Sequence, residues 1–351
     1  MISRPASPHH KTAHLTASDY QKAAGYLRRG GLVVFPTETV YGLGADAFQA
    51  DAVDSIFAAK GRPADNPLIV HLPEVSWIER VAASVPAHAE LLFRRFSPGP
   101  LTLILPRLPE LPAAATAGLP TVGVRIPSHP VCRKFLIACG TPVAAPSANR
   151  SGRPSPTDAA MARREMDGRV HAILDGGPCE HGLESTVALV EERRIVVLRE
   201  GAVTREMMQG VLGRIPVLAP NSTAEPELSA ASPGTRHAHY KPAARVVLFE
   251  AGRLSAALAE GEGSRTGVIT LMKRDAAAAT GGGRETQVPG GPGSRHLLRS
   301  MKSVEDYAHS LYRTFVEFDH AGCDLILAEL PPAGGIGAAL RDRLRRAAGQ
   351  E

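Results

Sequence analysis

Extended and helical patterns alternate along residues 18–217, and this alternation limits the chain to an α/β fold. Ser18 is a typical N-cap residue for a helix through Arg29, and the apolar run Leu32–Phe35 then predicts a buried strand. Further helices are predicted at 51–60, 87–96 and 158–166, and further strands at 68–72, 101–105, 122–126, 143–145, 172–174, 185–189 and 195–198. So many strands predict one large, twisted mixed sheet with flanking helices.

A change in composition after Val217 marks the predicted end of this first domain. Residues 218–232 are rich in Pro, Ser, Ala and Glu and lack apolar periodicity, as interdomain linkers do. Beyond them, extended and helical patterns predict a smaller α/β domain with a Rossmann-like sheet and an Ala- and Gly-rich mobile loop at 276–293. The predicted parts are a flexible tail at 1–14, a first domain at 15–217, a linker at 218–243 and a C-terminal domain at 244–351.

Composition and charge restrict the class of protein. Of the 351 residues, 44% are apolar and 21% charged, which is typical of a globular protein with room for two cores. The net charge of +5 favours phosphate-bearing partners, nucleotide or nucleic acid, without choosing between them. The four cysteines show no C-x-x-C spacing, so we expect free, buried thiols. Because no secretory signal or membrane-spanning apolar stretch stands in the sequence, we expect a cytoplasmic protein without membrane contact.

The segment Lys60–Leu68 places two cations and an amide in a loop that Gly61 and Pro63 constrain. Arg62 can form a forked pair with a phosphate or carboxylate, and Lys60 can supply a compact charge. An isolated segment of this kind is more often a solvated surface turn. The loop alone therefore leaves two alternatives, an anion site or an ordinary turn.

Polar residues gather at the ends of several predicted strands. Arg125 stands inside an apolar strand, where its charge requires an anionic partner, either a ligand or an internal Asp or Glu. Residues 145–155 contain three serines, an asparagine and two arginines, a density that resembles a phosphate or ribose cradle. Gly182–Val187 and Arg199–Gly201 again place a hydroxyl or an arginine beside a glycine. Because ligands of open α/β sheets bind at such strand ends, these segments predict a common site.

Six of these segments stand in a specific order and spacing. They are P-T-E-T-V-Y-G-L-G at 36–44, K-G-R-P-A-D-N-P-L at 60–68, S-P-G-P-L-T at 97–102, V-G-V-R-I-P at 122–127, A-P-S-A-N-R-S-G at 145–152 and E-S-T-V at 184–187. Together they resemble the YrdC-type L-threonylcarbamoyl-AMP synthases over residues 18–212. The end of the chain, with Ser232–Gly234, His239–Tyr240 and G-I-G-A-A-L-R-D-R-L-R-R-A-A at 335–348, resembles the two-domain form of that family. The linker departs slightly from the family pattern at Thr235 and Lys241.

The resemblance implies a nucleotidyltransferase that condenses L-threonine, bicarbonate or CO₂, and ATP to threonylcarbamoyl-AMP and pyrophosphate. Mg²⁺ is expected to accompany ATP, with no metal site made by the protein, and the linker is expected to cover the active site. The product would pass to the transferase complex that modifies the tRNA adenosine beside the anticodon, with tRNA contact by this chain an open alternative. By matching position, the threonine-binding residues are Thr39, His71, Arg125, Ala145 and Ser185, the ATP-binding residues are Arg62, Asn66, Thr121, Ser147, Ser155, Arg199 and Tyr240, and the catalytic residues are Lys60 and Arg62.

Two other functions share parts of this pattern. A YrdC-like domain can be a non-catalytic RNA-binding module, but only 5% of the residues are aromatic and no Lys/Arg-rich tract is present. The carbamoyltransfer enzyme of hydrogenase maturation uses a related domain, but it carries paired C-x-x-C fingers that this sequence lacks.

By itself His71 could be an ordinary structural histidine, and His237 with His239 is a weak metal motif without further ligands.

Overall fold

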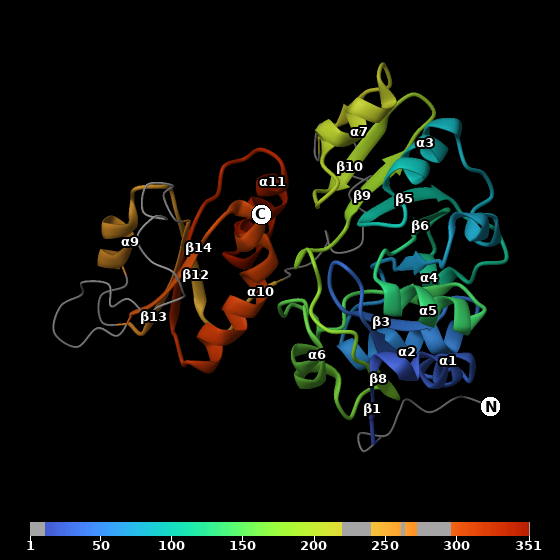
Figure 1. Ribbon diagram of the computed structural model, residues 1–351, viewed down its shortest axis with the longest axis horizontal. Helices are drawn as coiled ribbons and strands as arrows, with labels where there is room; N and C mark the ends of the chain where they lie inside the picture. The colour runs from blue at the N-terminus through green and yellow to red at the C-terminus, as the bar shows by residue number, and fades with distance from the viewer. Residues whose placement is uncertain (1–10, 220–239, 261–263, 272–295, 351) are drawn as a thin grey trace. The chain divides into compact units, whose positions relative to one another are not determined.

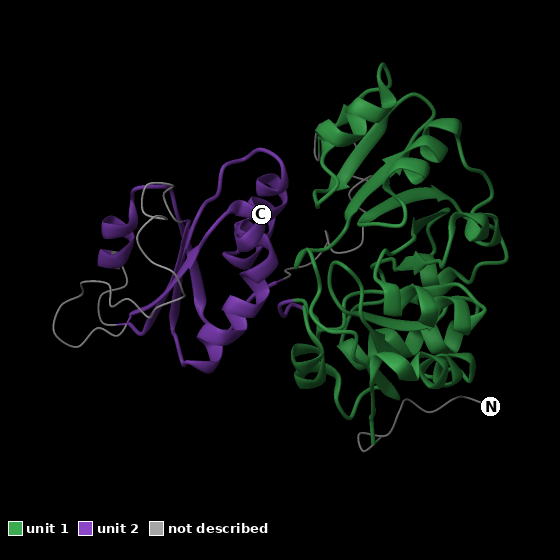
Figure 2. Ribbon diagram, viewed as in Figure 1, with its two compact units in different colours: residues 1–151, 155–237 green, residues 152–154, 238–351 purple. Residues whose placement is uncertain are grey.

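The computed structural model describes residues 11–219, 240–260, 264–271 and 296–350 (Figure 1). The chain divides into two compact units, unit 1 at 1–151 and 155–237 and unit 2 at 152–154 and 238–351 (Figure 2). The insert at 276–293, most of the linker and the histidines at 237 and 239 lie outside the described residues. In the described ranges, no helix has the length and apolar character needed to cross a membrane.

Unit 1 is built on one mixed sheet of eleven strands, as the sequence predicts. The strands in sheet order are β1 (Ala13–Leu15), β8 (Ala172–Leu174), β2 (Val33–Phe35), β3 (Gly42–Asp46), β7 (Val143–Ala145), β4 (Ile69–His71), β6 (Thr121–Arg125), β5 (Leu101–Pro106), β9 (Thr186–Val190), β10 (Ile195–Arg199) and β11 (Val217–Leu218). The α-helices of the unit are α1 (Tyr20–Arg28), α2 (Ala50–Lys60), α3 (Ala87–Phe96), α4 (Ala113–Thr116), α5 (Pro130–Cys139), α6 (Ala159–Met166) and α7 (Arg205–Leu212).

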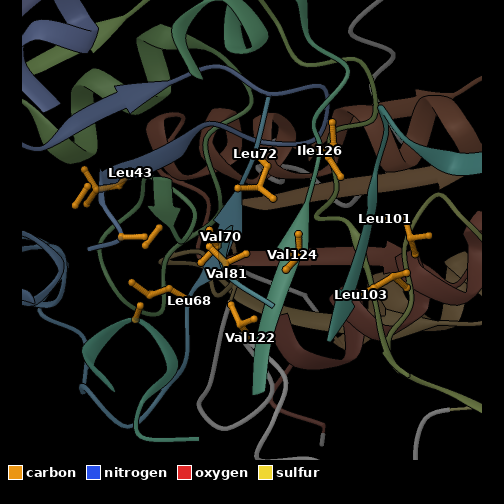
Figure 3. Packing of buried hydrophobic residues seen from close by; sticks show 14 of the residues in the cluster. Leu43, Leu68, Val70, Leu72, Val81, Leu101, Leu103, Val122, Val124 and Ile126 are labelled. Atoms are coloured by element: carbon orange, nitrogen blue, oxygen red, sulfur yellow. The ribbon is translucent and has the colours of Figure 1, made fainter. Parts of the chain in front are cut away.

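Helices cover the two faces of this sheet unequally. Alternate side chains along a strand point to opposite faces, so Val70 and Val124 share one face with Leu103 in the main core (Figure 3). On the opposite face, α1 and α5 cover only the half that contains β1, β8, β2 and β7. The other half of that face carries an apolar cluster made, among the described residues, of strand side chains alone: Ile69, Ile104, Val187, Leu189, Val196, Leu198 and Leu218. A polar site can therefore form on the sheet surface itself.

Three expectations for the first domain are wrong in detail. The first helix begins at Tyr20 after a 3₁₀ turn, and the capping contact runs from Thr16 N–H to Asp19 Oδ2 at 2.9 Å rather than through Ser18. Residues 13 and 14 do not belong to a flexible tail, because β1 pairs in parallel with β8. Leu218 belongs to β11 and not to the linker. Strands of two or three residues are too short to leave a periodic pattern in a sequence.

The strand β3 is a fourth difference, because no strand is predicted between Phe35 and Leu68. Gly42 and Gly44 instead pair with Phe35 and Val33 of β2. A Cβ on Gly44 would lie 2.8 Å from both the Phe35 ring and a Val143 methyl group. Close packing within the sheet therefore requires glycine at position 44, because the β-branched side chains that are typical of strands would not fit there.

Unit 2 contains a smaller, wholly parallel sheet, which agrees with the predicted Rossmann-like domain. Its strands in sheet order are β12 (Arg245–Phe249), β15 (Leu325–Glu329), β13 (Thr266–Leu271) and β14 (His296–Met301), and its helices are α9 (Leu254–Glu260), α10 (Val304–His320) and α11 (Ile336–Ala347). The strand β14 is not predicted, because its side chains are mostly half-buried and lack a clear apolar alternation. Gly337 is the second residue of α11, and a glycine is needed there because a Cβ would lie 2.0 Å from the Pro332 oxygen.

Candidate active site

A buried turn between β2 and β3 aims two side chains at Arg125. Thr37 holds this turn, because its hydroxyl donates to the Val40 oxygen at 2.6 Å and accepts the Thr39 N–H at 3.2 Å. Arg125 Nη2 donates to Glu38 Oε1 at 2.8 Å and to Thr39 Oγ1 at 2.9 Å. The anionic partner that Arg125 requires is therefore supplied, at least in part, by an internal glutamate.

Arg125 is one member of a row of polar side chains that crosses the sheet. Strand register places it between His71 of β4 and Thr102 of β5. Thr102 Oγ1 lies 2.9 Å from Ser185 Oγ, and Arg199 donates from Nη2 to the same hydroxyl at 3.2 Å. We call His71, Arg125, Thr102, Ser185 and Arg199 the polar row. Because His71 stands two residues after Ile69, and Thr102 two before Ile104, the row lies on the face that carries the strand-only apolar cluster.

The basic segment begins where α2 ends. Gly61 caps the helix in the left-handed conformation, with φ of 60°, so that the chain turns sharply after Lys60. The Lys60 ammonium is buried and donates to the carbonyl oxygens of Ser147 and Asn149. Arg62 Nη2 donates to the carbonyl oxygens of Asn66 and Pro67, each at 3.3 Å. Both cations therefore stabilise loop backbone. Lys60 binds the 145–155 segment, and Arg62 binds the 60–68 segment to which it belongs.

The 145–155 segment joins the basic segment to the Thr39 turn. The Ser151 N–H donates to the Lys60 oxygen at 2.9 Å, and the Leu43 N–H donates to the Pro146 oxygen at 2.9 Å. Ser147 Oγ donates to Asn149 Oδ1 at 2.5 Å. At its far end, Ser155 Oγ donates to Glu184 Oε1 at 2.6 Å. Glu184 directly precedes Ser185 in the sequence, so the segment reaches from Lys60 to the polar row.

Burial controls the charge of two residues in this region. Burial, and then the charge of Arg62, hold the pKa of Lys60 well below its usual value. Burial, and then the charge of Arg125, lower the pKa of His71 to about 3, so the imidazole is neutral at pH 7. The His71 ring packs edge-on against Phe35, with centroids 5.7 Å apart. A neutral imidazole beside an arginine can accept or donate a hydrogen bond without adding charge.

All residues predicted from the sequence except Tyr240 lie in unit 1. Ala145 ends β7 and pairs with Ile69, next to the polar row. Thr121 starts β6, where it pairs with Pro106, four residues along the strand from Arg125. Tyr240 belongs to unit 2, where its ring stacks on Tyr312 with centroids 5.4 Å apart. A nucleotide contact by Tyr240 stays a prediction.

The sequence reasoning did not assign three residues of the site, namely Glu38, Thr102 and Glu184. Glu38 and Glu184 stand directly beside the assigned Thr39 and Ser185, whereas Thr102 ends the 97–102 segment, which contains no assigned residue. Arg125 requires an anion, which is a signal for Glu38, but the two residues are 87 positions apart. Thr102 and Glu184 became visible only through their contacts with Ser185 and Ser155. In the described ranges, no group of three or more His, Cys, Asp or Glu is arranged to hold a metal ion.

Comparison with known proteins shows the family. A family model described as "Telomere recombination" matches residues 25–201, and one described as "Threonylcarbamoyl-AMP synthase, C-terminal domain" matches residues 203–349. The threonylcarbamoyl-AMP synthase of Bacillus subtilis is 40% identical over 348 residues, which cover 96% of each chain. This chain belongs to the threonylcarbamoyl-AMP synthase family. The protein of the same name from Pyrococcus abyssi is 40% identical over 336 residues, 93% of each chain.

Solved structures agree with this assignment. The crystal structure of P. abyssi Sua5 complexed with L-threonine superposes with a TM-score of 0.83 at 38% identity, over 97% of this chain and 98% of the other. The predicted family and fold are therefore confirmed, and the comparisons do not support a non-catalytic RNA-binding module. A shorter relative, the putative threonylcarbamoyl-AMP synthase of Mycobacterium tuberculosis, is 41% identical over 191 residues, 54% of this chain and 88% of the relative.

Proposed function

We propose that this protein is an L-threonylcarbamoyl-AMP synthase, a nucleotidyltransferase that joins L-threonine, bicarbonate or CO₂, and ATP. The observation that carries the proposal is the buried polar row, which stands beside the basic segment in a chain matched along nearly its full length by synthases of that name. The product would supply a transferase complex that modifies tRNA.

The threonine end of the site is proposed to lie at the centre of the row. A carboxylate requires a guanidinium group, which Arg125 supplies. Thr39 and Ser185 add hydroxyl groups, and neutral His71 adds a polar contact without further charge. The backbone of Ala145 completes the set. These residues form one buried wall, and the Thr39–Arg125 contact holds it together.

The ATP end is proposed to follow the basic segment and the 145–155 segment. Arg62 offsets negative charge on the phosphates, while Asn66, Ser147, Ser155 and Arg199 add polar contacts. Thr121, at the start of β6, and Tyr240, in unit 2, are further proposed contacts. Mg²⁺ is proposed to enter with ATP as part of the substrate, since this ion is usually held by phosphates with few protein ligands.

The chemistry then needs positioning more than a protein nucleophile. The threonine nitrogen attacks the carbon of CO₂, one carbon–oxygen π pair moves to oxygen, and two protons leave the nitrogen overall to give a carbamate. A carbamate oxygen attacks the α-phosphorus of ATP, and the bond to the bridging oxygen breaks to release pyrophosphate. Holding both reactants in line accounts for much of the rate, and Arg62 with Lys60 neutralises charge on the leaving group.

The test is pyrophosphate release by the purified full-length protein supplied with ATP, Mg²⁺, bicarbonate and threonine. Release should require every component, and omission of threonine alone should abolish it. Arg125→Gln should lose threonine-dependent release, whereas Arg94→Gln, at an exposed site on α3, should retain it. Tight tRNA binding without any pyrophosphate release would instead establish the RNA-binding module.

A further inference from the structure

The ion pair between Glu38 and Arg125 is buried but incompletely satisfied. Their side chains are only 2% and 4% exposed, and a single hydrogen bond, from Arg125 Nη2 to Glu38 Oε1, joins them. Among the described residues, Glu38 Oε2 and Arg125 Nε have no hydrogen-bond partner. An unpaired acceptor and an unpaired donor on one buried pair are costly, and such a pair in a native structure needs an explanation, which a bound ligand would provide.

The two unpaired atoms complement the two charged groups of an α-amino acid. Arg125 Nε–H can donate to a carboxylate, and Glu38 Oε2 can accept from an ammonium group. The turn that carries Glu38 is rigid, since Thr37 bonds across it and the Glu38 oxygen accepts the His181 N–H at 2.8 Å. The carboxylate is therefore fixed in direction before any ligand arrives, which reduces the entropy lost on binding.

We propose that Glu38 Oε2 binds the ammonium group of threonine and accepts the proton that its nitrogen must release before attack. This inference rests on the synthase function proposed above and adds a catalytic residue to it. The first proton passes from the threonine nitrogen to Oε2, which leaves a neutral amine and a carboxylic acid. The nitrogen lone pair then forms the bond to the carbon of CO₂, and the second proton passes from nitrogen to solvent water. Glu38 returns its proton to solvent when the product leaves.

The other titratable groups near the row are less suited to this task. The His71 Nδ1 atom lies 3.1 Å from the Ile69 oxygen, and the Lys60 ammonium is engaged by two carbonyls. Glu184 accepts from Ser155. The titratable and charged groups that act on Glu38 from the elements around it are Arg125 on β6, His129 and Cys132 at the start of α5, and Cys179 after β8.

The test compares threonine with (R)-3-hydroxybutyrate, which is threonine without its amino group. Calorimetric titration of the wild-type protein should show threonine binding at least ~10-fold more tightly, because a hydrogen bond to a charged group is lost with the amine. Glu38→Gln should weaken threonine binding by roughly 10- to 100-fold and leave 3-hydroxybutyrate binding within about threefold. Glu38→Asp, which keeps the charge, should show an intermediate loss for threonine only. Glu191→Gln is the matched control, since Glu191 pairs with Arg194 in the β9–β10 hairpin.

Turnover provides the second readout. At saturating threonine, pyrophosphate release by Glu38→Gln should be slow at neutral pH and should recover towards the wild-type rate at a pH where the free amine is already deprotonated. If Glu38→Gln weakened the binding of threonine and of 3-hydroxybutyrate equally, Glu38 would be only a structural partner of Arg125, and the proposal would be overturned. A wild-type protein that binds both ligands equally well would also overturn it, an outcome that needs no variant. If the wild-type protein released no pyrophosphate, the proposed synthase function would be wrong. The calorimetry would still test whether Glu38 contacts the ammonium group of threonine.

Discussion

Thr102 Oγ1 lies 2.9 Å from Ser185 Oγ, and this contact joins β5 to the residue that precedes β9. Both side chains are fully buried. Ser185 also accepts from Arg199, so the hydroxyl pair connects the arginine at one end of the polar row to Arg125 at its centre. The orientation of Ser185, a proposed threonine contact, therefore depends on a residue that need not touch the substrate.

Thr102→Val tests this dependence, because valine keeps the shape and removes the hydroxyl. We expect the KM for threonine to rise roughly 5- to 10-fold and the free energy of unfolding to fall by about 1–2 kcal/mol, the usual cost of one lost buried hydrogen bond. Thr116→Val is the control, since Thr116 is buried elsewhere in unit 1 and makes only a long contact to Ala113. Steady-state kinetics and urea unfolding measure both effects. An unchanged KM would show that Arg199 alone orients Ser185.

Lys60→Met removes the donor that Ser147 and Asn149 share. Each orphaned carbonyl costs about 1–3 kcal/mol, and relief of the buried charge offsets part of that cost. We therefore expect a net destabilisation of about 1–3 kcal/mol. The KM for ATP should rise at least ~10-fold, because the 145–155 segment loses its anchor. Lys134→Met, at an exposed position of α5, should change neither value. A selective loss of kcat with normal KM and stability would instead show that Lys60 acts only on the leaving group and does not anchor the 145–155 segment.

The predicted site residues stand in compact segments at strand ends, and the structure connects several of these segments by side-chain contacts. The need of Arg125 for an anion follows from its apolar neighbours, and the structure shows that need met by Glu38. The partner itself was beyond prediction, because only the folded sheet brings positions 38 and 125 together. The same holds for Lys60: the segment that it shares with Arg62 could be an anion site or a solvated turn, whereas the fold directs its ammonium to the carbonyl oxygens of Ser147 and Asn149.

The fold was predictable wherever apolar runs are long, and it was not where packing overrides propensity. The strands at 101–105 and 122–126 were expected from their apolar residues and form the centre of the sheet. In contrast, β3 contains Gly42 and Gly44, which disfavour a strand by themselves. Its formation depends on Phe35 and Val143, which fill the space above the two glycines. Neither neighbour can be assigned to β3 without knowledge of the strand order.

His71 should make the stability of unit 1 depend on pH. Its pKa is about 3 in the folded protein and near the ordinary value of 6.5 in the unfolded chain. Between these values the unfolded state binds more protons, so stability is greatest above pH 6.5 and falls as the pH is lowered, by at most ~1.4 kcal/mol per pH unit. His71→Asn should remove this component. Urea unfolding between pH 7.5 and 4 should therefore show a smaller acid loss in the variant. Ile69→Val, a neighbouring change without a titrating group, should cost the same at every pH.

Tyr240 should be held in unit 2 by its ring and strained at its backbone. The ring stacks on Tyr312 and faces the Arg343 guanidinium at 5.4 Å, while its φ of 68° lies in the left-handed region. Tyr240→Phe keeps the ring, and we expect a change below about 1 kcal/mol. Tyr240→Ala loses the ring contacts and should cost about 2–4 kcal/mol.

Comparison of Tyr240→Gly with Tyr240→Ala distinguishes the effect of backbone strain from the effect of losing the ring. Glycine loses the same contacts as alanine but adopts the positive φ without strain, which is worth about 1 kcal/mol. The glycine variant should therefore be the more stable of the two, although elsewhere an alanine usually gains about 0.4–1 kcal/mol over glycine through the unfolded chain. Hydrogen exchange of the amides of α10 and α11 measures both variants in the full-length protein. An alanine variant more stable than the glycine variant would show that residue 240 leaves the left-handed region once its ring is removed.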